Sequence, residues 1–216
     1  LTSSMVSMLK NADKSILIDS ESWTNVDSPN VSAYAKSKTL AEKSAWEFIK
    51  NQDKKSPMEL TVINPGPVFG PTLSNHLEGA SMSMFKQMIT GKMPMVPQAA
   101  INMSDVRDVP KIHVLSLENK NANGKRFIVT TEKPYSFQQL AKILKSNGYN
   151  KVSTRLAPNL LLKFLGYFDR EAKSMRAFIG KTYNGDVSQT METFNWKPIA
   201  IEKTVLDTAK SIQSLI

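Results

Sequence analysis

Cysteine is absent from this sequence of 216 residues, and histidine occurs only twice. Without thiols the chain can form neither a disulfide nor a thiolate metal site. His76 and His113 are too few for a histidine-based metal centre, so we expect no metal ion. Any chemistry must therefore come from other side chains.

Long apolar runs are lacking as well. No run reaches the roughly 20 residues that a helix needs to cross a bilayer, and the residues after Leu1 do not follow the basic-then-apolar order of a signal peptide. The composition, with 41% hydrophobic and 22% charged residues, is that of a globular protein with a core. These features predict a soluble, cytoplasmic protein with no membrane partner.

Dense clusters of positive charge are also missing, although the formal net charge is +9 and the pI is about 9.6. Binding of nucleic-acid phosphates needs lysine and arginine gathered on one face. Here these residues are spread along the chain, and the densest groups are the pairs Lys54–Lys55 and Lys125–Arg126. We therefore expect a solvated basic surface and no nucleic-acid partner.

The order of the remaining patterns predicts strands that alternate with helices. Residues 10–33 are polar and rich in turn-forming residues, which predicts a long surface loop. A helix is expected over Ala33–Asn51, because small and apolar residues recur there at helical spacing. The β-prone run Glu59–Ile63 predicts a strand that ends in the constrained loop Pro65–Pro71. Ligands of open α/β sheets sit at such carboxyl ends.

Similar patterns continue through the second half of the chain. Asp105 is the expected cap of a helix over Val106–Glu118, and Ser136 with Gln139 has capping-box spacing before a helix that Gly148 would end. Residues 157–216 are expected to form a small, mainly helical lobe. The other expected elements are a Met-rich amphipathic stretch, two strands and two late helices: Met82–Ile89, Ile101–Ser104, Arg126–Thr130, Leu160–Phe168 and Ile201–Ile216.

Tyr34 and Lys38 form a Tyr-x-x-x-Lys pattern at the start of the first expected helix. Residues four apart lie on the same helix face, one turn from each other. A nearby ammonium favours the ionised form of a phenol, which would help Tyr34 to exchange a proton with a substrate near neutral pH. The same pattern also occurs on ordinary amphipathic helices, so its surroundings decide its meaning.

The surroundings favour a functional role. Ser4 follows Thr2 and Ser3 at the expected end of a strand, where its hydroxyl could donate a hydrogen bond to a carbonyl oxygen. An acidic loop, the Tyr-x-x-x-Lys pattern, the loop Pro65–Pro71 and then Asp105-Val-Arg-Asp-Val109 come after it in that order. Chance rarely supplies such an ordered set.

In this order the residues resemble the extended short-chain dehydrogenase/reductase family. The segment Tyr-Ala-Lys-Ser-Lys-Thr-Leu-Ala-Glu-Lys, residues 34–43, is similar to the dihydroflavonol-reductase branch, which includes microbial aldehyde and ketone reductases. The late segments Asp186-Val-Ser-Gln-Thr190 and Asn195-Trp-Lys-Pro198 resemble the Asp-x-Ser-Lys and Gly-Trp-x-Pro of that family. The resemblance covers essentially the whole chain.

The resemblance implies a catalytic centre in which Ser4 polarises a substrate carbonyl, Tyr34 acts as general acid and Lys38 holds the nicotinamide ribose. The implied cofactor is NADP, with NAD as the other possibility. The residues implied to contact it are Thr2, Ser3, Tyr34, Lys38, Pro65, Gly66, Pro67 and Val68. The candidate substrate contacts are Met5, Leu9, Phe69, Met82 and Phe85, of which the last two belong to a methionine-rich stretch that suits either a pocket or ordinary packing.

Two departures from the family pattern narrow these expectations. The nine glycines are scattered, and none forms the Gly-x-x-Gly-x-x-Gly turn that seats the pyrophosphate. We therefore expect the chain to be the carboxy-terminal portion of a longer protein, with the glycine-rich half absent from it. Plant flavonoid reductases carry asparagine where this chain has Leu9, so a smaller or more apolar aldehyde or ketone fits better.

The expected fold class is α/β: the carboxy-terminal part of a Rossmann-type, doubly wound sheet plus a smaller, mainly helical substrate lobe. Residues 1–71 would supply the later strands and the catalytic helix, and residues 72–216 the lobe, with about 101–130 returning to the sheet. The predicted activity is NAD(P)H-dependent reduction of small aldehydes or ketones. Two alternatives stay open, namely a nucleotide-sugar epimerase or dehydratase with the same triad and a non-catalytic, cofactor-binding regulatory protein.

Overall fold

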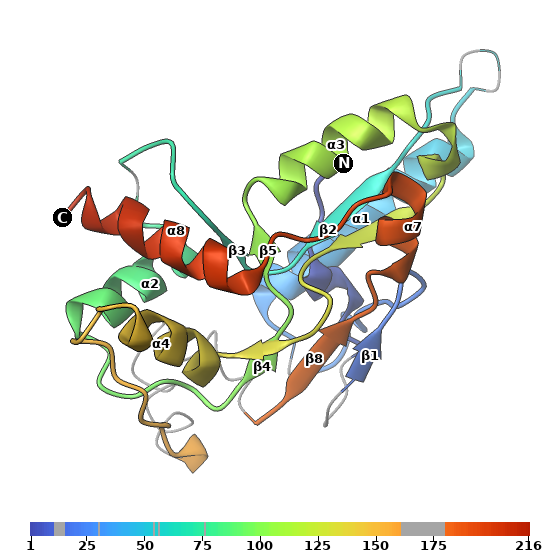
Figure 1. Ribbon diagram of the computed structural model, residues 1–216. Coiled ribbons are helices and arrows are strands. Elements are labelled where there is room, and N and C mark those ends of the chain that lie inside the picture. Colours follow the sequence, from blue (N-terminus) through green and yellow to red (C-terminus); the bar gives the residue numbers. More distant parts are fainter. Residues whose placement is uncertain (11–15, 30, 54, 56, 76, 161–179) are drawn as a thin grey trace.

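A parallel sheet forms the centre of the protein. The computed structural model describes residues 1–216 except 11–15, 30, 54, 56, 76 and 161–179 (Figure 1). Strands β2 (Val62–Pro65) and β6 (Arg126–Val129) pair in parallel, and Thr2 forms a parallel bridge to the opposite edge of β2. Every residue of β2 and β6 is buried, as expected of parallel strands that are covered on both faces.

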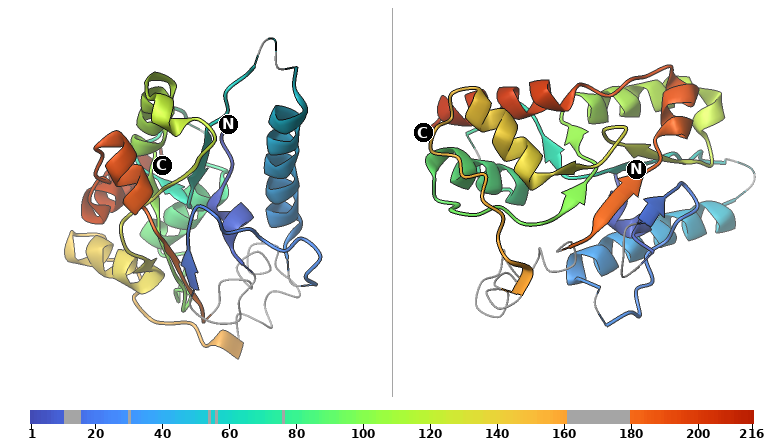
Figure 2. Two further views of the ribbon diagram at one scale, coloured as in Figure 1. Left: turned by 90° about the vertical axis from the view of Figure 1, so that its right-hand side faces the viewer. Right: turned by 60° about the horizontal axis from the view of Figure 1, so that its bottom comes forward.

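Helices cover both faces of this central sheet (Figure 2, left). Helix α1 (Ala33–Asn51) packs against the 3-10 turn η1 (Met5–Met8) on one face. Helices α3 (Asp108–Glu118) and α7 (Ser188–Phe194) pack against β2 and β6 on the other, and the short 3-10 turn η2 (Lys120–Ala122) follows α3. This layering confirms the predicted α/β class.

Two further sets of strands flank the central sheet. One contains β1, β8, β4 and β7 in that spatial order, with β8 parallel to β1 and β4, and with β4 antiparallel to β7. The other is the parallel pair of β3 and β5. Their bounds are Ile16–Ile18 (β1), Val68–Phe69 (β3), Ala100–Ile101 (β4), Ser104–Asp105 (β5), Tyr135–Ser136 (β7) and Thr182–Gly185 (β8).

The main hydrophobic core lies between the flanking strands and three amphipathic helices. Helix α8 (Ile201–Gln213) packs against α2 (Ala80–Thr90) and α4 (Phe137–Ser146). A second, smaller core on the α3 and α7 side of the central sheet contains Phe127 and Trp196. The central strands therefore separate a large core from a small one, and both faces of β2 and β6 are filled.

Several helices begin and end where the sequence predicts them. Helix α1 has the predicted bounds, and α4 begins with the predicted capping box, in which Ser136 and Gln139 bond each other's backbone. Gly148, just beyond α4, has a φ of 91°, which is the left-handed conformation expected of a helix-stop glycine. Among the described residues no helix is long and apolar enough to cross a membrane.

Two predictions about elements are wrong. Residues 10–33 are not only loop, because they contain strand β1. Asp105 does not cap α3, which begins at Asp108 with Arg107 as its N-cap residue. The described part of residues 157–216 contains helices α7 and α8 and one strand, β8, which lies between β1 and β4; that residues 157–216 form a separate lobe stays a prediction. The predicted helix Leu160–Phe168 falls, after Leu160, outside the described residues.

Candidate active site

Ser4 lies at the carboxyl end of a parallel strand. The backbone of Ser3 donates to the carbonyl of Ile63 at 2.8 Å, and Ile63 donates to the carbonyl of Leu1 at 2.9 Å. Thr2 is bridged to Ile63, so Ser4 and Pro65, the last residue of β2, each follow this bridge by two residues in parallel chains. Ser4 then caps η1, and its hydroxyl accepts from the backbone of Val6. The edge of the sheet predicted to bind ligand therefore presents Ser4 and the Pro65 loop together.

Tyr34 and Lys38 occupy the first two turns of α1. Ser32 caps this helix by accepting from the backbone of Ala35 at 3.1 Å. Tyr34 is 57% exposed and Lys38 is half-buried. Four-residue spacing continues to Glu42, so the three side chains follow one another along one face of α1. Glu42 contacts the turn of residues 3–8 that contains Ser3, Ser4 and Ser7, called the serine turn below. That Tyr34 and Lys38 face Ser4 from the same helix stays a prediction.

Glu42 is the centre of a buried polar network. Its Oε2 atom accepts from the hydroxyls of Ser3 and Ser7, the latter at 2.6 Å, and from Asn64 Nδ2 at 3.0 Å. Its Oε1 atom accepts from Arg126 Nε at 2.5 Å, and both side chains of this ion pair are almost fully buried. Residues of α1, η1, β2 and β6 thus meet at one carboxylate.

Arg126 extends this network to the loop before α1. Its Nη1 atom donates to the carbonyls of Ser20 and Ser22 at 2.8 and 2.7 Å. Its guanidinium lies 3.8 Å from the ring centroid of Trp23, a cation–π stacking distance. One arginine at the start of β6 therefore holds the acidic loop against the serine turn.

Glu42 remains ionised although it is buried, because these donors stabilise its carboxylate. Burial is the largest single influence on its pKa and raises it, since a buried carboxylate loses its hydration. The Arg126 guanidinium and the hydroxyls of Ser3 and Ser7 act in the opposite direction, and together they hold the pKa of Glu42 below its ordinary value of 4.5. Glu42 is therefore an anion at neutral pH.

The loop after β2 is held tightly against its neighbours. The backbone of Gly66 donates to Ser104 Oγ at 2.9 Å, and that hydroxyl donates in turn to the carbonyl of Val129 at 2.6 Å. A Cβ atom at Gly66 would lie 2.6 Å from the carbonyl oxygen of Asn102, so only glycine fits there. Gly66, Pro67 and Val68 are half-exposed, which leaves the loop accessible.

Thr2 and Ser3, two of the predicted cofactor contacts, form side-chain hydrogen bonds within the protein. Ser3 is buried and its hydroxyl donates to Glu42. Thr2 Oγ1 lies 2.8 Å from His113 Nε2, and His113 Nδ1 lies 2.8 Å from the carbonyl of Val109. Since a carbonyl only accepts, Nδ1 carries a proton, and in the neutral ring Nε2 accepts from Thr2. Contact of either hydroxyl with a cofactor stays a prediction.

The predicted substrate contacts lie mostly in the main core. Four of the five are buried there, namely Met5, Leu9, Phe69 and Phe85, and Met82 is partly buried against them. Phe69 and Phe85 contact each other with their ring centroids 4.9 Å apart. These side chains support the fold directly, and a role in lining a substrate pocket stays a prediction.

A match to a known protein family covers most of the chain. Residues 1–158 match the model of the 3-beta hydroxysteroid dehydrogenase/isomerase family. The chain belongs to this family. This membership confirms the resemblance to extended short-chain dehydrogenases/reductases.

Individual relatives of this dehydrogenase family are reductases. The NADPH-dependent methylglyoxal reductase GRE2 of Saccharomyces cerevisiae is 32% identical over 150 residues, which are 65% of this chain and 44% of that protein. Cinnamoyl-CoA reductase CAD2 of Medicago truncatula is 30% identical over 150 residues, covering 67% of this chain and 44% of that protein. The crystal structure of Gre2 with NADPH from Candida albicans matches 99% of this chain and 63% of its own, with a TM-score of 0.74 and 25% identity. The chain spans less than half the length of these two curated relatives.

The residues present fit the nicotinamide end of a dinucleotide in this dehydrogenase family. Ser4 and Tyr34 offer hydroxyls, Lys38 offers an ammonium, and the Gly66 loop offers an accessible backbone beside a strand end. The sequence offers no glycine-rich turn for the pyrophosphate. The fit therefore extends to the nicotinamide riboside and no further.

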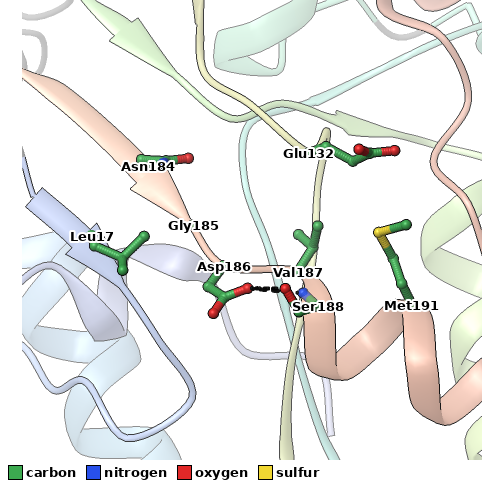
Figure 3. A pocket seen from close by; sticks show the side chains of 8 residues that line it. All are labelled: Leu17, Glu132, Asn184, Gly185, Asp186, Val187, Ser188 and Met191. Carbon is green, nitrogen blue, oxygen red and sulfur yellow. Dashed lines mark hydrogen bonds between the residues drawn. The ribbon is translucent and has the colours of Figure 1, made fainter.

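A shallow hollow of about 200 Å³ lies at the carboxyl end of β8 (Figure 3). Its lining includes Asp186, which accepts from the backbone and hydroxyl of Ser188, and Glu132. None of the predicted catalytic residues lines it. The candidate active site remains the predicted one, at Ser4, Tyr34 and Lys38, and Glu42 links the serine turn to the helix that carries Tyr34 and Lys38.

The buried polar network around Glu42 was not predicted from the sequence. Ser7, Glu42, Asn64 and Arg126 carry it, and each is buried. One signal was available, because Glu42 continues the spacing of Tyr34 and Lys38 on a helix face rich in alanine. A carboxylate on such a face needs a buried partner, but the sequence does not show which one.

Proposed function

We propose that this chain carries the catalytic centre of an NADPH-dependent reductase of small aldehydes or ketones. The observation that best supports the proposal is that Glu42 of α1 bonds Ser3 and Ser7 on either side of Ser4, while Tyr34 and Lys38 precede Glu42 on the same helix at four-residue spacing. The GRE2 and cinnamoyl-CoA reductase relatives support the same activity. The reductase would be the longer protein that contains this chain, called the full-length enzyme below.

The proposed chemistry uses two hydroxyls on one oxygen atom. NADPH supplies the hydride to the carbonyl carbon. Ser4 donates a hydrogen bond to the carbonyl oxygen, and Tyr34 donates the proton that this oxygen gains. Lys38 holds the ribose and stabilises negative charge on the Tyr34 oxygen after the proton has left. Glycine at position 66 lets the loop pack against the carbonyl of Asn102, and this packing would fix the loop beside the nicotinamide ring.

Replacing Tyr34 by phenylalanine tests this proposal in the full-length enzyme. The variant Tyr34→Phe removes one oxygen atom, and since Tyr34 is largely exposed its fold should survive. Positioned acid catalysis contributes about 10²–10⁴-fold, so kcat for methylglyoxal or a small ketone should fall by that order. The Kd of NADPH should change little. Near-normal turnover of Tyr34→Phe would remove the proposed acid.

A matched control separates this loss from general damage to α1. Lys36 lies between Tyr34 and Lys38 in the sequence and is exposed on a different face of the helix. Lys36→Met should retain full turnover. Equal losses in Lys36→Met and Tyr34→Phe would show that disturbance of the helix, and not loss of the hydroxyl, lowers the rate.

A further inference from the structure

The buried anion of Glu42 contacts both halves of the candidate catalytic centre. On one side its carboxylate accepts from Ser3 and Ser7, which flank Ser4 on either side. On the other side it belongs to α1, the helix of Tyr34 and Lys38. Nothing in the proposed chemistry uses Glu42 directly, and no substrate atom could reach so deeply buried a group.

The contacts around Ser4 leave its turn little freedom. The carbonyl of Ser4 accepts from the backbone of Ser7 at 2.9 Å and from Asn64 Nδ2 at 3.3 Å, while the hydroxyl proton of Ser7 goes to Glu42. Asn64 and Ser7 both donate to Glu42 as well. A shift of the Glu42 carboxylate would therefore be transmitted to Ser4 through two donors.

The same carboxylate also sets the position of Tyr34. An α-helix rises about 1.5 Å per residue, so the eight residues from Tyr34 to Glu42 span about 12 Å of rigid helix. Rotation or sliding of α1 at Glu42 moves Tyr34 by a similar amount. A misplacement of about 1 Å at reacting groups can cost about 10²-fold in rate, which makes such a contact kinetically important.

Arg126 keeps the Glu42 carboxylate ionised and fixes its orientation through a hydrogen-bonded ion pair. It neutralises Glu42, and it anchors the loop whose Thr24 hydroxyl donates to the carbonyl of Val6 in η1 at 2.7 Å. A buried ion pair is weak evidence for stability, because desolvation offsets its attraction. Its directional hydrogen bonds, in contrast, fix a single relative placement of the elements that meet at it.

We propose that Glu42, held by Arg126, is a positioning residue that fixes the Ser4 turn relative to the Tyr34 helix. This role rests on the proposed reductase function. Glu42 acts through its hydrogen bonds and exchanges no proton with the substrate. Its loss should therefore lower the rate of the chemical step while the binding of NADPH and the shape of the pH profile remain.

The test compares Glu42→Gln with the double variant Glu42→Gln/Arg126→Met in the full-length enzyme. Glutamine keeps the shape of the side chain but loses its charge and one acceptor atom, so kcat per folded molecule should fall about 10- to 100-fold. The Kd of NADPH should stay within about twofold, because the long, charged side chain of Lys38 can follow a small shift of α1 and Gly66 is held by Ser104 and not by Glu42. The double variant removes the uncompensated guanidinium and should regain thermal stability without regaining kcat.

A control variant has the same chemistry on the other side of the sheet. Asp108 is a buried carboxylate of α3 that accepts from Trp196 Nε1 at 3.0 Å and from the backbone of Ile199 at 2.9 Å. Asp108→Asn should lower the melting temperature and leave kcat unchanged. A fall in kcat for Asp108→Asn as large as that for Glu42→Gln would assign the effect to general destabilisation and overturn the proposal.

Hydrogen exchange separates this proposal from the proposed function. In Glu42→Gln the backbone amides of residues 3–8 and 33–38 should exchange faster, whether or not the enzyme reduces carbonyls. Unchanged exchange there, or normal kcat in Glu42→Gln, would overturn the positioning role. A wild-type enzyme without carbonyl reduction would overturn the proposed function instead. If Glu42→Gln does not fold, Ser7→Ala removes one of the same hydrogen bonds and is expected to give a smaller change of the same kind.

Discussion

Lys38 and Tyr34 occupy successive turns of α1, yet their replacement should have different consequences. In the full-length enzyme Lys38→Met removes a charged donor to the cofactor, and a charged hydrogen bond is worth about 1.5–3 kcal/mol. The Kd of NADPH should rise about 10-fold or more, as measured by titration of cofactor fluorescence. Tyr34→Phe should leave this Kd nearly unchanged. Equal affinity losses in the two variants would contradict the separate roles proposed for these residues.

Gly66 offers a second test at the scale of one residue. The added methyl of Gly66→Ala would lie 2.6 Å from the Asn102 carbonyl oxygen, which is backbone and cannot rotate away. The loop must therefore shift, at a cost of about 1–3 kcal/mol, and the affinity for NADPH should fall. Gly79→Ala adds the same methyl where nothing lies within 4 Å, and it should retain NADPH affinity. Thermal unfolding and cofactor titration of both variants check this expectation.

Single residues were predictable where their meaning is local. Tyr34 and Lys38 could be paired from spacing alone, because helix geometry fixes which neighbours share a face. The position of Ser4 could be predicted because the residues before it have the pattern of a strand that ends there. Glu42 and Arg126 could not be paired, since no local rule links a helix residue to a strand that follows so much later in the chain.

At the scale of one element, α4 provides a test of the capping box. Ser136 Oγ accepts from the backbone of Gln139 at 3.1 Å, and Gln139 Oε1 accepts from the backbone of Ser136 at 2.7 Å. Ser136→Ala removes the serine half of this arrangement and should destabilise the protein by about 1 kcal/mol. Ser146→Ala, at the other end of α4, should change the free energy of unfolding by no more than about 0.5 kcal/mol. Urea denaturation of the two variants distinguishes a cap from an ordinary serine.

Helices with clear caps and periodicity were predictable, and short strands were not. Helix α1 and the start of α4 follow from spacing and from serine caps. Strand β1 has only three residues, and Leu17 in its middle is exposed, so no alternation marks it. The start of α3 was missed because Asp105 bonds the guanidinium of Arg107 and the hydroxyl of Thr204, as well as the backbone of Arg107.

At the scale of the whole molecule, several paired carboxylates predict a loss of stability in acid. Burial is the largest influence on the pKa of Glu42 and of Asp105 and raises both, but paired arginines and hydroxyl donors hold each pKa below its ordinary value. The pKa of Asp207 is lowered by hydrogen bonds from Lys203 and Arg107. A lowered native pKa means that the stabilisation is complete above the unfolded-state value, 4.5 for Glu42, and is lost as the pH falls through the native value.

The free energy of unfolding should accordingly fall as the pH decreases from about 5 to 3. The Glu42→Gln variant lacks the carboxyl group that takes up a proton when the protein unfolds in acid. The difference in free energy of unfolding between this variant and the wild type should therefore be largest at neutral pH and should decrease in acid. Chemical denaturation at several pH values measures both curves. A difference that widens toward acid pH would contradict the ionised, paired state of Glu42.

The pairing of β1 with β8 has a consequence for the order in which the chain is made. Within the described sheet the partner of β1 is β8, and Ile16 lies opposite Tyr183. During synthesis residues 16–18 cannot pair with β8 until residues 182–185 have left the ribosome. Contacts between such distant residues form slowly, because a long loop must close first. A nascent chain that ends before β8 lacks this partner of β1, and we expect molecular chaperones to bind such chains during that interval.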